Sequence, residues 1–97
     1  MATYVVLVNW TEQGAREAKA LPHRIDTARE LLGKNGGQLI NVYMTMGGYD
    51  AVSIIEAPSD EVMAKVLLTI GSGGKIRTTT LKAFGESELR QIVGSLE

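Results

Sequence analysis

The chain has 97 residues, of which 44% are hydrophobic and 22% charged, with a net charge of −1. This length and composition fit one domain with one core, and the near-neutral charge gives no field that would attract nucleic acid or an anionic membrane. The absence of cysteine excludes disulfides and thiol chemistry, and a single histidine leaves no multi-histidine metal site within one chain.

No apolar run approaches the roughly 20 residues that span a bilayer, and the N-terminus lacks the pattern of a signal peptide. We therefore expect a cytoplasmic protein that forms a single domain over residues 1–97. We expect no metal, no cofactor and no membrane or nucleic-acid partner.

The first elements alternate between strand and helix signals. Residues 3–9 form a nearly continuous apolar run, which is typical of a strand buried on both faces. Thr11 is a predicted helix N-cap, but Gly14 stands where a capping box needs Glu or Gln, so residues 12–20 predict only a short helix. Pro22 fits the first turn of a longer helix. Its apolar stripe is Leu21, Ile25, Ala28 and Leu32, with charged Arg24, Asp26, Arg29 and Glu30 elsewhere on the wheel.

Two alternating runs, residues 38–46 and 49–56, lie on either side of Gly47-Gly48 and predict a β-hairpin. A two-residue turn sets a register in which Ile40 faces Ile55. One face of this hairpin is almost wholly apolar. The other face is mixed but still apolar enough to require a cover. The apolar residues on this mixed face are Leu39, Tyr43, Val52 and Ile54.

The second half repeats the order of helix and strand. Ser59 is a predicted N-cap for a helix that the glycines of residues 71–74 end. Residues 75–83 are rich in β-branched side chains and predict the last strand, and residues 86–93 predict a short C-terminal helix.

The predicted fold class is α+β, with the β-α-β-β-α-β order of the ferredoxin-like fold. Right-handed crossovers give a four-stranded antiparallel sheet of strand order 4-1-3-2 with the helices on one face. The mixed apolar face of the sheet then lies open. A second copy of the same sheet is the simplest cover, so we expect a homodimer or a higher homo-oligomer.

The chain resembles the GYD domain family in three segments, residues 47–52, 71–78 and 81–84. The likeness covers nearly all of the chain, including residues 4–7, Trp10-Thr11, Gly14 and Pro22. The resemblance implies a ferredoxin-like domain akin to the dimeric α+β barrels. It implies no activity and no catalytic role for any residue.

In this topology the first strand ends, the hairpin turns and the last strand begins at the same edge of the sheet. Aromatic and polar residues gather there beside Thr11, where a helix N-terminus favours anions. We predict that this edge is the rim of a small-molecule pocket between the helices and the open sheet face. The candidate ligand-binding residues are Asn9, Trp10, Tyr43, Tyr49, Asp50 and Arg77.

Each candidate also has a structural alternative. Asp50 can bond to turn amides or pair with Arg77 or Lys75, and Trp10 and Tyr49 can serve packing alone. An arginine can bind a carboxylate through two parallel hydrogen bonds, but an ion pair between strands uses the same geometry. The aromatic side chain on the open face, Tyr43, can be a proton donor or an interface residue.

Three further signals are interpreted as structural. His23 lies away from the predicted edge, without a partner at ligand spacing, and is expected at the surface. The glycines of residues 71–74 run from a helix into a strand, opposite to a phosphate-binding loop, which excludes a nucleotide site there. RNA-recognition domains share this architecture, but the open face here offers Asp50 and Glu56 in place of their aromatic motif.

Two function classes remain open. The first is a homo-oligomeric small-molecule-binding or interaction module without catalysis. The second is a cofactor-independent enzyme, an oxygenase or isomerase of the dimeric α+β barrel type that acts on a small apolar or aromatic compound. Such an enzyme needs an acid or base beside an apolar cavity, and the sequence offers only Tyr43, Asp50 and Arg77.

Overall fold

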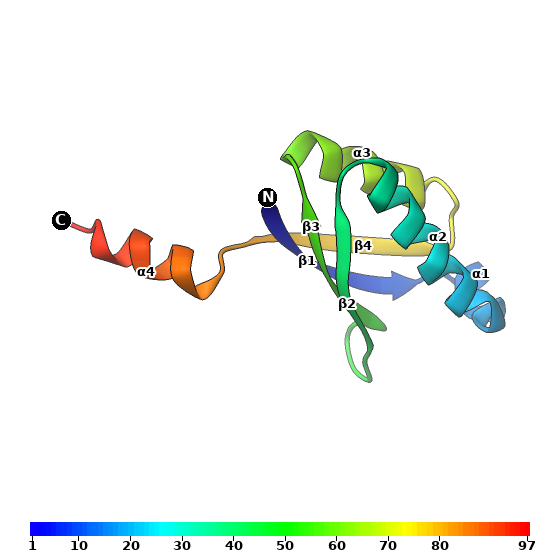
Figure 1. Ribbon diagram of the computed structural model, residues 1–97. Coiled ribbons are helices and arrows are strands. Elements are labelled where there is room, and N and C mark those ends of the chain that lie inside the picture. The colour runs from blue at the N-terminus through cyan, green and yellow to red at the C-terminus, as the bar shows by residue number, and fades with distance from the viewer.

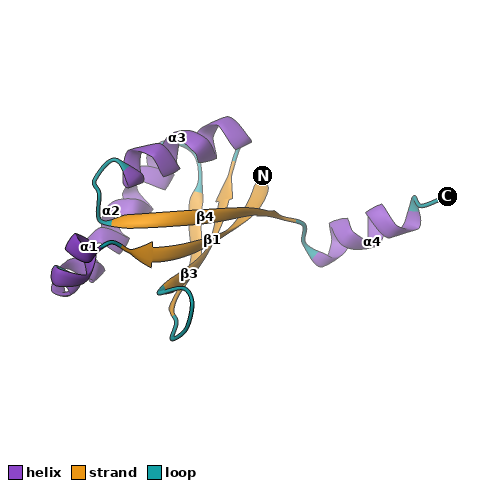
Figure 2. Cartoon of the chain, turned by 180° about the vertical axis from the view of Figure 1, so that it is seen from behind, coloured by secondary structure: helices purple, strands orange, loops and turns teal.

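The computed structural model describes residues 1–97 and shows one antiparallel sheet with helices on one face (Figures 1 and 2). The strands are β1 (Ala2–Trp10), β2 (Gln38–Met44), β3 (Ala51–Ala57) and β4 (Ile76–Ala83). Their order in the sheet is β2-β3-β1-β4, which is the predicted order counted from the other edge. The α+β class and the ferredoxin-like arrangement are therefore confirmed.

The helices are α1 (Glu12–Arg16), a single 3-10 turn (Ala18–Ala20), α2 (Leu21–Lys34), α3 (Asp60–Gly71) and α4 (Glu86–Gly94). Helices α2 and α3 cover the sheet, whereas α4 continues beyond the end of β4 and stands away from the rest of the molecule (Figure 1). None of these helices combines the length and the apolar character that crossing a bilayer requires.

Both predicted side-chain caps form. The Thr11 hydroxyl accepts a hydrogen bond from the Gly14 amide at 3.1 Å, and the Ser59 hydroxyl accepts one from the Val62 amide at 3.2 Å. The structure also explains the missing capping box of α1. A Cβ atom at Gly14 would lie 2.0 Å from the carbonyl oxygen of Lys75, so this close approach of α1 to the start of β4 leaves room for glycine alone.

The hairpin keeps the predicted register near its turn, with Met44 opposite Ala51. The strands stop earlier than a two-residue turn requires. The Thr45 amide donates to the Asp50 carbonyl at 2.9 Å, and the residues between them form the loop. Within this loop Gly47 has a φ of 151°, a conformation that side chains disfavour.

The predicted pairing of Ile40 with Ile55 is wrong. An irregularity between Leu39 and Asn41 shifts the register, so that Leu39 lies opposite Ile55. Because of this bulge, Leu39 points to the helices and is buried, while Ile40 is 40% exposed. Packing against the helices therefore decides which of two adjacent apolar residues turns inward.

The core between sheet and helices is filled mainly at one end. Its buried apolar side chains come from the start of β1, the start of β2, the end of β3, the end of α2 and the first half of α3. They are Tyr4, Val6, Leu32, Leu39, Ile55, Ala57, Met63 and Val66. We call this the closed end of the layer, because the opposite end, near the hairpin loop, has no buried apolar side chain.

The face of the sheet away from the helices has an apolar centre. Antiparallel partners point to the same side of a sheet, and the register therefore groups Val5 with Ile54 and Leu81, and Leu7 with Val52. Val52 also lies opposite Tyr43, whose side chain is 56% exposed. The open face consists of Val5, Leu7, Tyr43, Val52, Ile54 and Leu81 with a polar rim that includes Gln38, Asn41, Glu56, Arg77 and Thr79.

Candidate functional site

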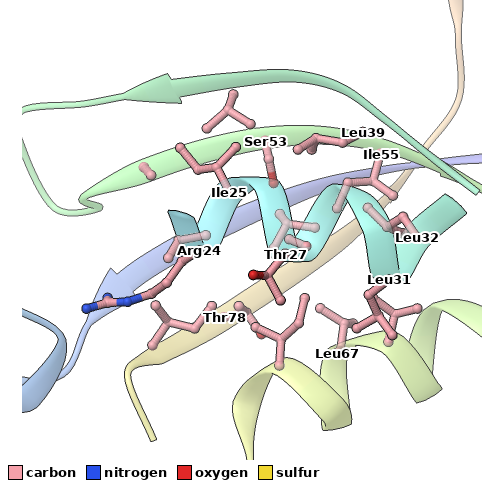
Figure 3. A pocket seen from close by; sticks show the side chains of 18 of the residues that line it. Arg24, Ile25, Thr27, Leu31, Leu32, Leu39, Ser53, Ile55, Leu67 and Thr78 are labelled. Atoms are coloured by element: carbon pink, nitrogen blue, oxygen red, sulfur yellow. The ribbon is translucent and has the colours of Figure 1, made fainter. Parts of the chain in front are cut away.

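A cavity of about 600 Å³ lies between the sheet and helices α2 and α3 (Figure 3). Eighteen of its 25 lining residues are hydrophobic, so it suits the apolar body of a small molecule. The volume falls in the range of a few hundred to about 1,000 Å³ that ligand pockets occupy. The cavity begins at the edge of the sheet where β1 ends and β4 begins, and it extends to the closed end.

Small side chains account for this hollow. Ala28 lies one helical turn before the fully buried Leu32 on the same face of α2. Likewise Ala51 lies on the same face of β3 as Ile55, four residues earlier. Both elements therefore present alanine toward the hairpin-loop end of the cavity and a large aliphatic side chain where the cavity meets the core. Interior positions normally interdigitate to native density, and the two alanines leave that volume unfilled.

Few polar groups face this space. The hydroxyls of Thr27 and Thr69 are used inside their own helices, where they donate to carbonyls one turn earlier at 3.0 and 2.8 Å. Ser53 of β3 is the one buried polar residue of the core, 8% exposed, and its hydroxyl points into the space between the sheet and α2 (Figure 3). The remaining polar lining residues are Arg24, Lys75 and Thr78.

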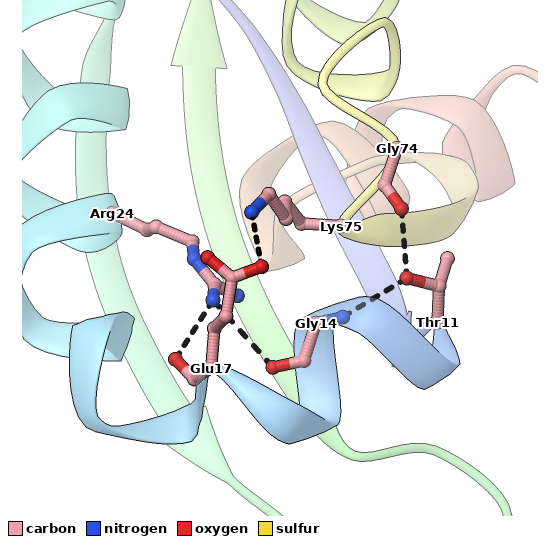
Figure 4. Close-up of polar contacts among 6 residues, drawn as sticks. All are labelled: Thr11, Gly14, Glu17, Arg24, Gly74 and Lys75. Atoms are coloured by element: carbon pink, nitrogen blue, oxygen red, sulfur yellow. Dashed lines mark hydrogen bonds and ion pairs between the residues drawn. The ribbon is translucent and has the colours of Figure 1, made fainter.

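Two cations that line the cavity, Arg24 and Lys75, lie beside the carboxylate of Glu17, and we call this end of the cavity its mouth (Figure 4). Arg24 Nη2 donates to the carbonyl of Glu17 at 2.8 Å and more weakly to that of Gly14 at 3.5 Å. Arg24 Nη1 is buried and has no hydrogen-bond partner. Lys75 Nζ forms an ion pair with the Glu17 carboxylate. The hydrogen bond from Lys75, and to a lesser degree the charge of Arg24, lower the pKa of Glu17, so this group is a carboxylate at neutral pH.

Three of the six predicted edge residues, Asn9, Trp10 and Asp50, take part in hydrogen bonds between the end of β1 and the hairpin loop. The Trp10 amide donates to Asp50 Oδ2 at 2.9 Å, and the Asp50 amide donates to the Val8 carbonyl at 2.8 Å. Asn9 Nδ2 donates to the Gly48 carbonyl at 3.0 Å. These bonds attach the hairpin loop to the end of β1. The Asp50 carboxylate thus has a structural partner, but this is the amide at the end of β1, and neither a turn amide nor Arg77 or Lys75.

Only one of the six candidates, Trp10, lines the cavity. Asn9 lies opposite Arg77 on the face of the sheet away from the helices, and Tyr43 belongs to the open face. Tyr49 is 39% exposed in the hairpin loop, where its carbonyl accepts a hydrogen bond from the Thr45 hydroxyl. His23 is exposed, as expected.

The structure adds Arg24 to the residues that sequence patterns singled out. Arg24 was expected on the polar side of its helix, yet it lines the cavity. The signal was present in the spacing, because Arg24 stands four residues before Ala28 and therefore shares the face of the apolar stripe. A charged residue on the apolar stripe of a helix indicates that it contacts a polar group in the space between the sheet and the helices.

A separate polar cluster lies at the closed end. The Tyr4 hydroxyl donates to the carboxylate of Asp60, which also pairs with Lys82 Nζ at 3.1 Å. Burial, followed by the hydrogen bond to Asp60, raises the pKa of Tyr4 to about 12. The hydrogen bond from Tyr4, followed by that from Lys82, lowers the pKa of Asp60. This cluster joins the start of α3 to β1 and β4. No three His, Asp or Glu side chains gather as metal ligands here or elsewhere.

The chain is similar in sequence or structure to several known proteins. A curated relative from Thermus thermophilus, the glutamine synthetase and cystathionine beta-lyase binding protein, is 31% identical over 90 residues that cover 92% of this chain and 95% of the relative. The crystal structure of TTHA0845, also from Thermus thermophilus, is similar with a TM-score of 0.56 and 26% identity, over 88% of this chain and 95% of that one.

The crystal structure of MtbAldR superposes with a TM-score of 0.69 at 15% identity and covers 88% of this chain. This chain spans 52% of the length of MtbAldR, and the likeness shows the fold alone. The model of the GYD domain family matches residues 4–93. With that match over nearly its whole length, the chain belongs to the GYD domain family.

Proposed function

We propose that this chain is a homo-oligomeric binding module that holds a small apolar molecule in the cavity between the sheet and the helices. The observation that carries the proposal is the cavity itself, with a volume of about 600 Å³ and a predominantly hydrophobic lining. A void of this size in so small a layer forgoes packing that a larger side chain at Ala28 or Ala51 would supply. A bound molecule would restore that packing.

The lining supports binding in preference to catalysis. It contains no carboxylate, imidazole or phenol, which are the usual general acids and bases. Tyr43, Asp50 and Arg77, the group that an enzyme would have to use, do not line the cavity. The name of the Thermus relative, a binding protein for two enzymes, is further support for a binding role in this family.

Self-association is the second part of the proposal. The apolar centre of the open face carries Leu81, 50% exposed, and Tyr43, 56% exposed, and a polar rim surrounds it. An apolar centre inside a polar rim is the usual anatomy of a protein–protein interface. Helix α4 also leaves apolar side chains uncovered, including Leu89 and Ile92. A second copy of the chain would cover the open face and give α4 a surface on which to pack.

Ligand binding is tested through Trp10, the only tryptophan, which lines the cavity. Titration with 1-octanol is expected to change the Trp10 fluorescence saturably. Ala28→Phe places a large side chain in the cavity and is expected to weaken octanol binding about tenfold. Ala64→Phe, at an exposed position of α3, is the matched control and should bind like the natural protein. A flat titration, or equal affinity in both variants, would refute the cavity as a binding site.

Self-association is tested by sedimentation at micromolar concentration. The natural chain and the control Ala64→Lys should sediment as a dimer or larger species. Val52→Lys places a charge at the centre of the open face and should yield monomers that keep the circular dichroism of the folded chain. A natural chain that is only monomeric would overturn this part of the proposal.

A further inference from the structure

We propose that the molecule held in the cavity is a monocarboxylate with an apolar tail, whose carboxylate binds at Arg24 and Lys75. This inference rests on the proposed binding function and names the chemical class of the ligand. It follows from the two ends of the cavity, which differ in chemistry. Figure 3 shows Arg24 at one end and Leu31, Leu32 and Leu67 at the other.

The first observation concerns the hydrogen bonds of Arg24. Its guanidinium is bound to the protein through Nη2 alone, by the carbonyls of Glu17 and Gly14. Nη1 is buried without an acceptor. Leaving a charged donor unsatisfied is costly, so buried polar atoms without partners are rare and need an explanation. A ligand oxygen at Nη1 would supply the missing acceptor once the side chains that cover this nitrogen move aside.

The second observation concerns charge at the mouth of the cavity. Arg24 and Lys75 bring two positive charges, and Glu17 brings one negative charge through its ion pair with Lys75. One positive charge is left without a counter-charge among these residues. A single carboxylate neutralises it, whereas the nearly doubly charged phosphate monoester would leave an excess negative charge. Guanidinium also binds carboxylates in a planar, charge-assisted geometry.

The third observation sets the direction of the tail. Beyond the mouth the lining is mostly hydrophobic and includes Ile25 and Ile70 on the helices and Ile76 on β4. The hydroxyls of Thr27 and Thr69 are bonded within their own helices. Leu32, Met63 and Val66 seal the closed end and are at most 1% exposed. An apolar tail can therefore extend inward, while the charged group stays at the mouth. Ser53 of β3 is the only buried polar residue between the mouth and the closed end.

The experiment compares sodium octanoate with 1-octanol, which have the same chain length and differ in charge. Calorimetric titration at neutral pH should show octanoate binding about tenfold more tightly than octanol, as one charge-assisted contact to a buried group predicts. Because the contact is electrostatic, added salt should reduce this preference.

Arg24→Met removes the charge and keeps an apolar side chain of similar length, and it should bring the octanoate-to-octanol affinity ratio close to one. Arg29→Met is the matched control on the same helix, because Arg29 is exposed and does not line the cavity, and it should keep the preference. Lys75→Met provides a second variant in case loss of Arg24 prevents folding, and it should also lower the ratio.

The outcomes separate the two proposals. If octanol binds in the cavity and octanoate binds no more tightly, the binding function stands and the carboxylate assignment is wrong. The assignment is also wrong if Arg24→Met and Lys75→Met both keep the preference. If neither probe binds, both the function and the assignment are refuted.

Discussion

The two ends of the layer between sheet and helices are built from the same elements and differ in how completely they are filled. At the closed end, Leu32 of α2 and Ile55 of β3 are buried, 0% and 5% exposed. At the end near the hairpin loop, Ala28 and Ala51 occupy the corresponding faces and the cavity opens between them. Side-chain volume, with no change of backbone topology, therefore divides one layer into a structural core and a binding site.

The polar groups follow the same division. At the closed end, the Tyr4 hydroxyl and Lys82 both bind Asp60, so each group has a partner. At the hollow end, near the hairpin loop, Nη1 of Arg24 is buried without a hydrogen-bond partner. A cluster whose hydrogen bonds are complete stabilises the fold, whereas the free Arg24 nitrogen offers a donor to a ligand. Thr80 Oγ1 of β4, opposite Val6, is also buried without a partner, but Thr80 does not line the cavity.

Substitution of core leucine is expected to have the largest effect. Leu32→Ala should lower the free energy of unfolding by about 3 kcal/mol, because it opens a void in the filled end. Ile25→Ala, on the same helix at the hollow end, should cost only about 1 kcal/mol, since its side chain is already partly unpacked. Urea unfolding followed by circular dichroism measures both. Equal losses would mean that the two ends are packed alike.

The mouth of the cavity depends on the close approach of α1 to β4. Gly14→Ala should destabilise by about 2 kcal/mol, because the new Cβ would lie 2.0 Å from the Lys75 carbonyl oxygen and would force the two segments apart. Gly33→Ala, in α2 with no atom within 4 Å of the new Cβ, should instead stabilise by about 0.5 kcal/mol through helix propensity. Thermal unfolding of both variants is the measurement. A harmless Gly14→Ala would contradict the close contact.

A further expected effect depends on pH and belongs to the closed end. Tyr4→Phe should lower Tm by about 5 °C at neutral pH, through loss of the hydrogen bond to Asp60. Folding raises the pKa of Tyr4 from 10.0 to about 12, so the stabilisation is complete below pH 10.0 and is lost as the pH rises toward 12.

The same bond has an acid limit. Folding lowers the pKa of Asp60 from its ordinary value of 3.8, so the stabilisation is present above that pH and is lost as the pH falls below it. The difference in Tm between the natural chain and Tyr4→Phe should therefore be largest between these two limits and should shrink on both sides. A difference that stays constant with pH would show that Asp60 does not accept this bond.

Local signals in the sequence predicted the fold well. The caps at Thr11 and Ser59 depend on residues three positions apart, and the strand order follows from alternation and crossover handedness, so no long-range information was needed. The bulge at Leu39 was missed because two adjacent apolar residues, Leu39 and Ile40, compete for the inward position, and only packing against the helices decides between them.

The site was harder to predict for a related reason. The cavity exists because small side chains, Ala28 of α2 and Ala51 of β3, line the same space between sheet and helices, and no motif in the sequence marks that coincidence. Of the six edge residues that the sequence suggested, Trp10 alone lines the cavity. Local sequence patterns also could not predict that α4 lies away from the sheet. Such patterns predict that a helix forms but not where it packs.

We expect the hollow end, and not the apolar centre of the open face, to take up the small molecule. Nuclear Overhauser effects between octanoate and assigned methyl groups test this most directly. We expect contacts from the octanoate chain to Ile25, Ile70 and Ile76, and none to Val5, Leu7 or Ile54 of the open face. Contacts confined to the open face would contradict it.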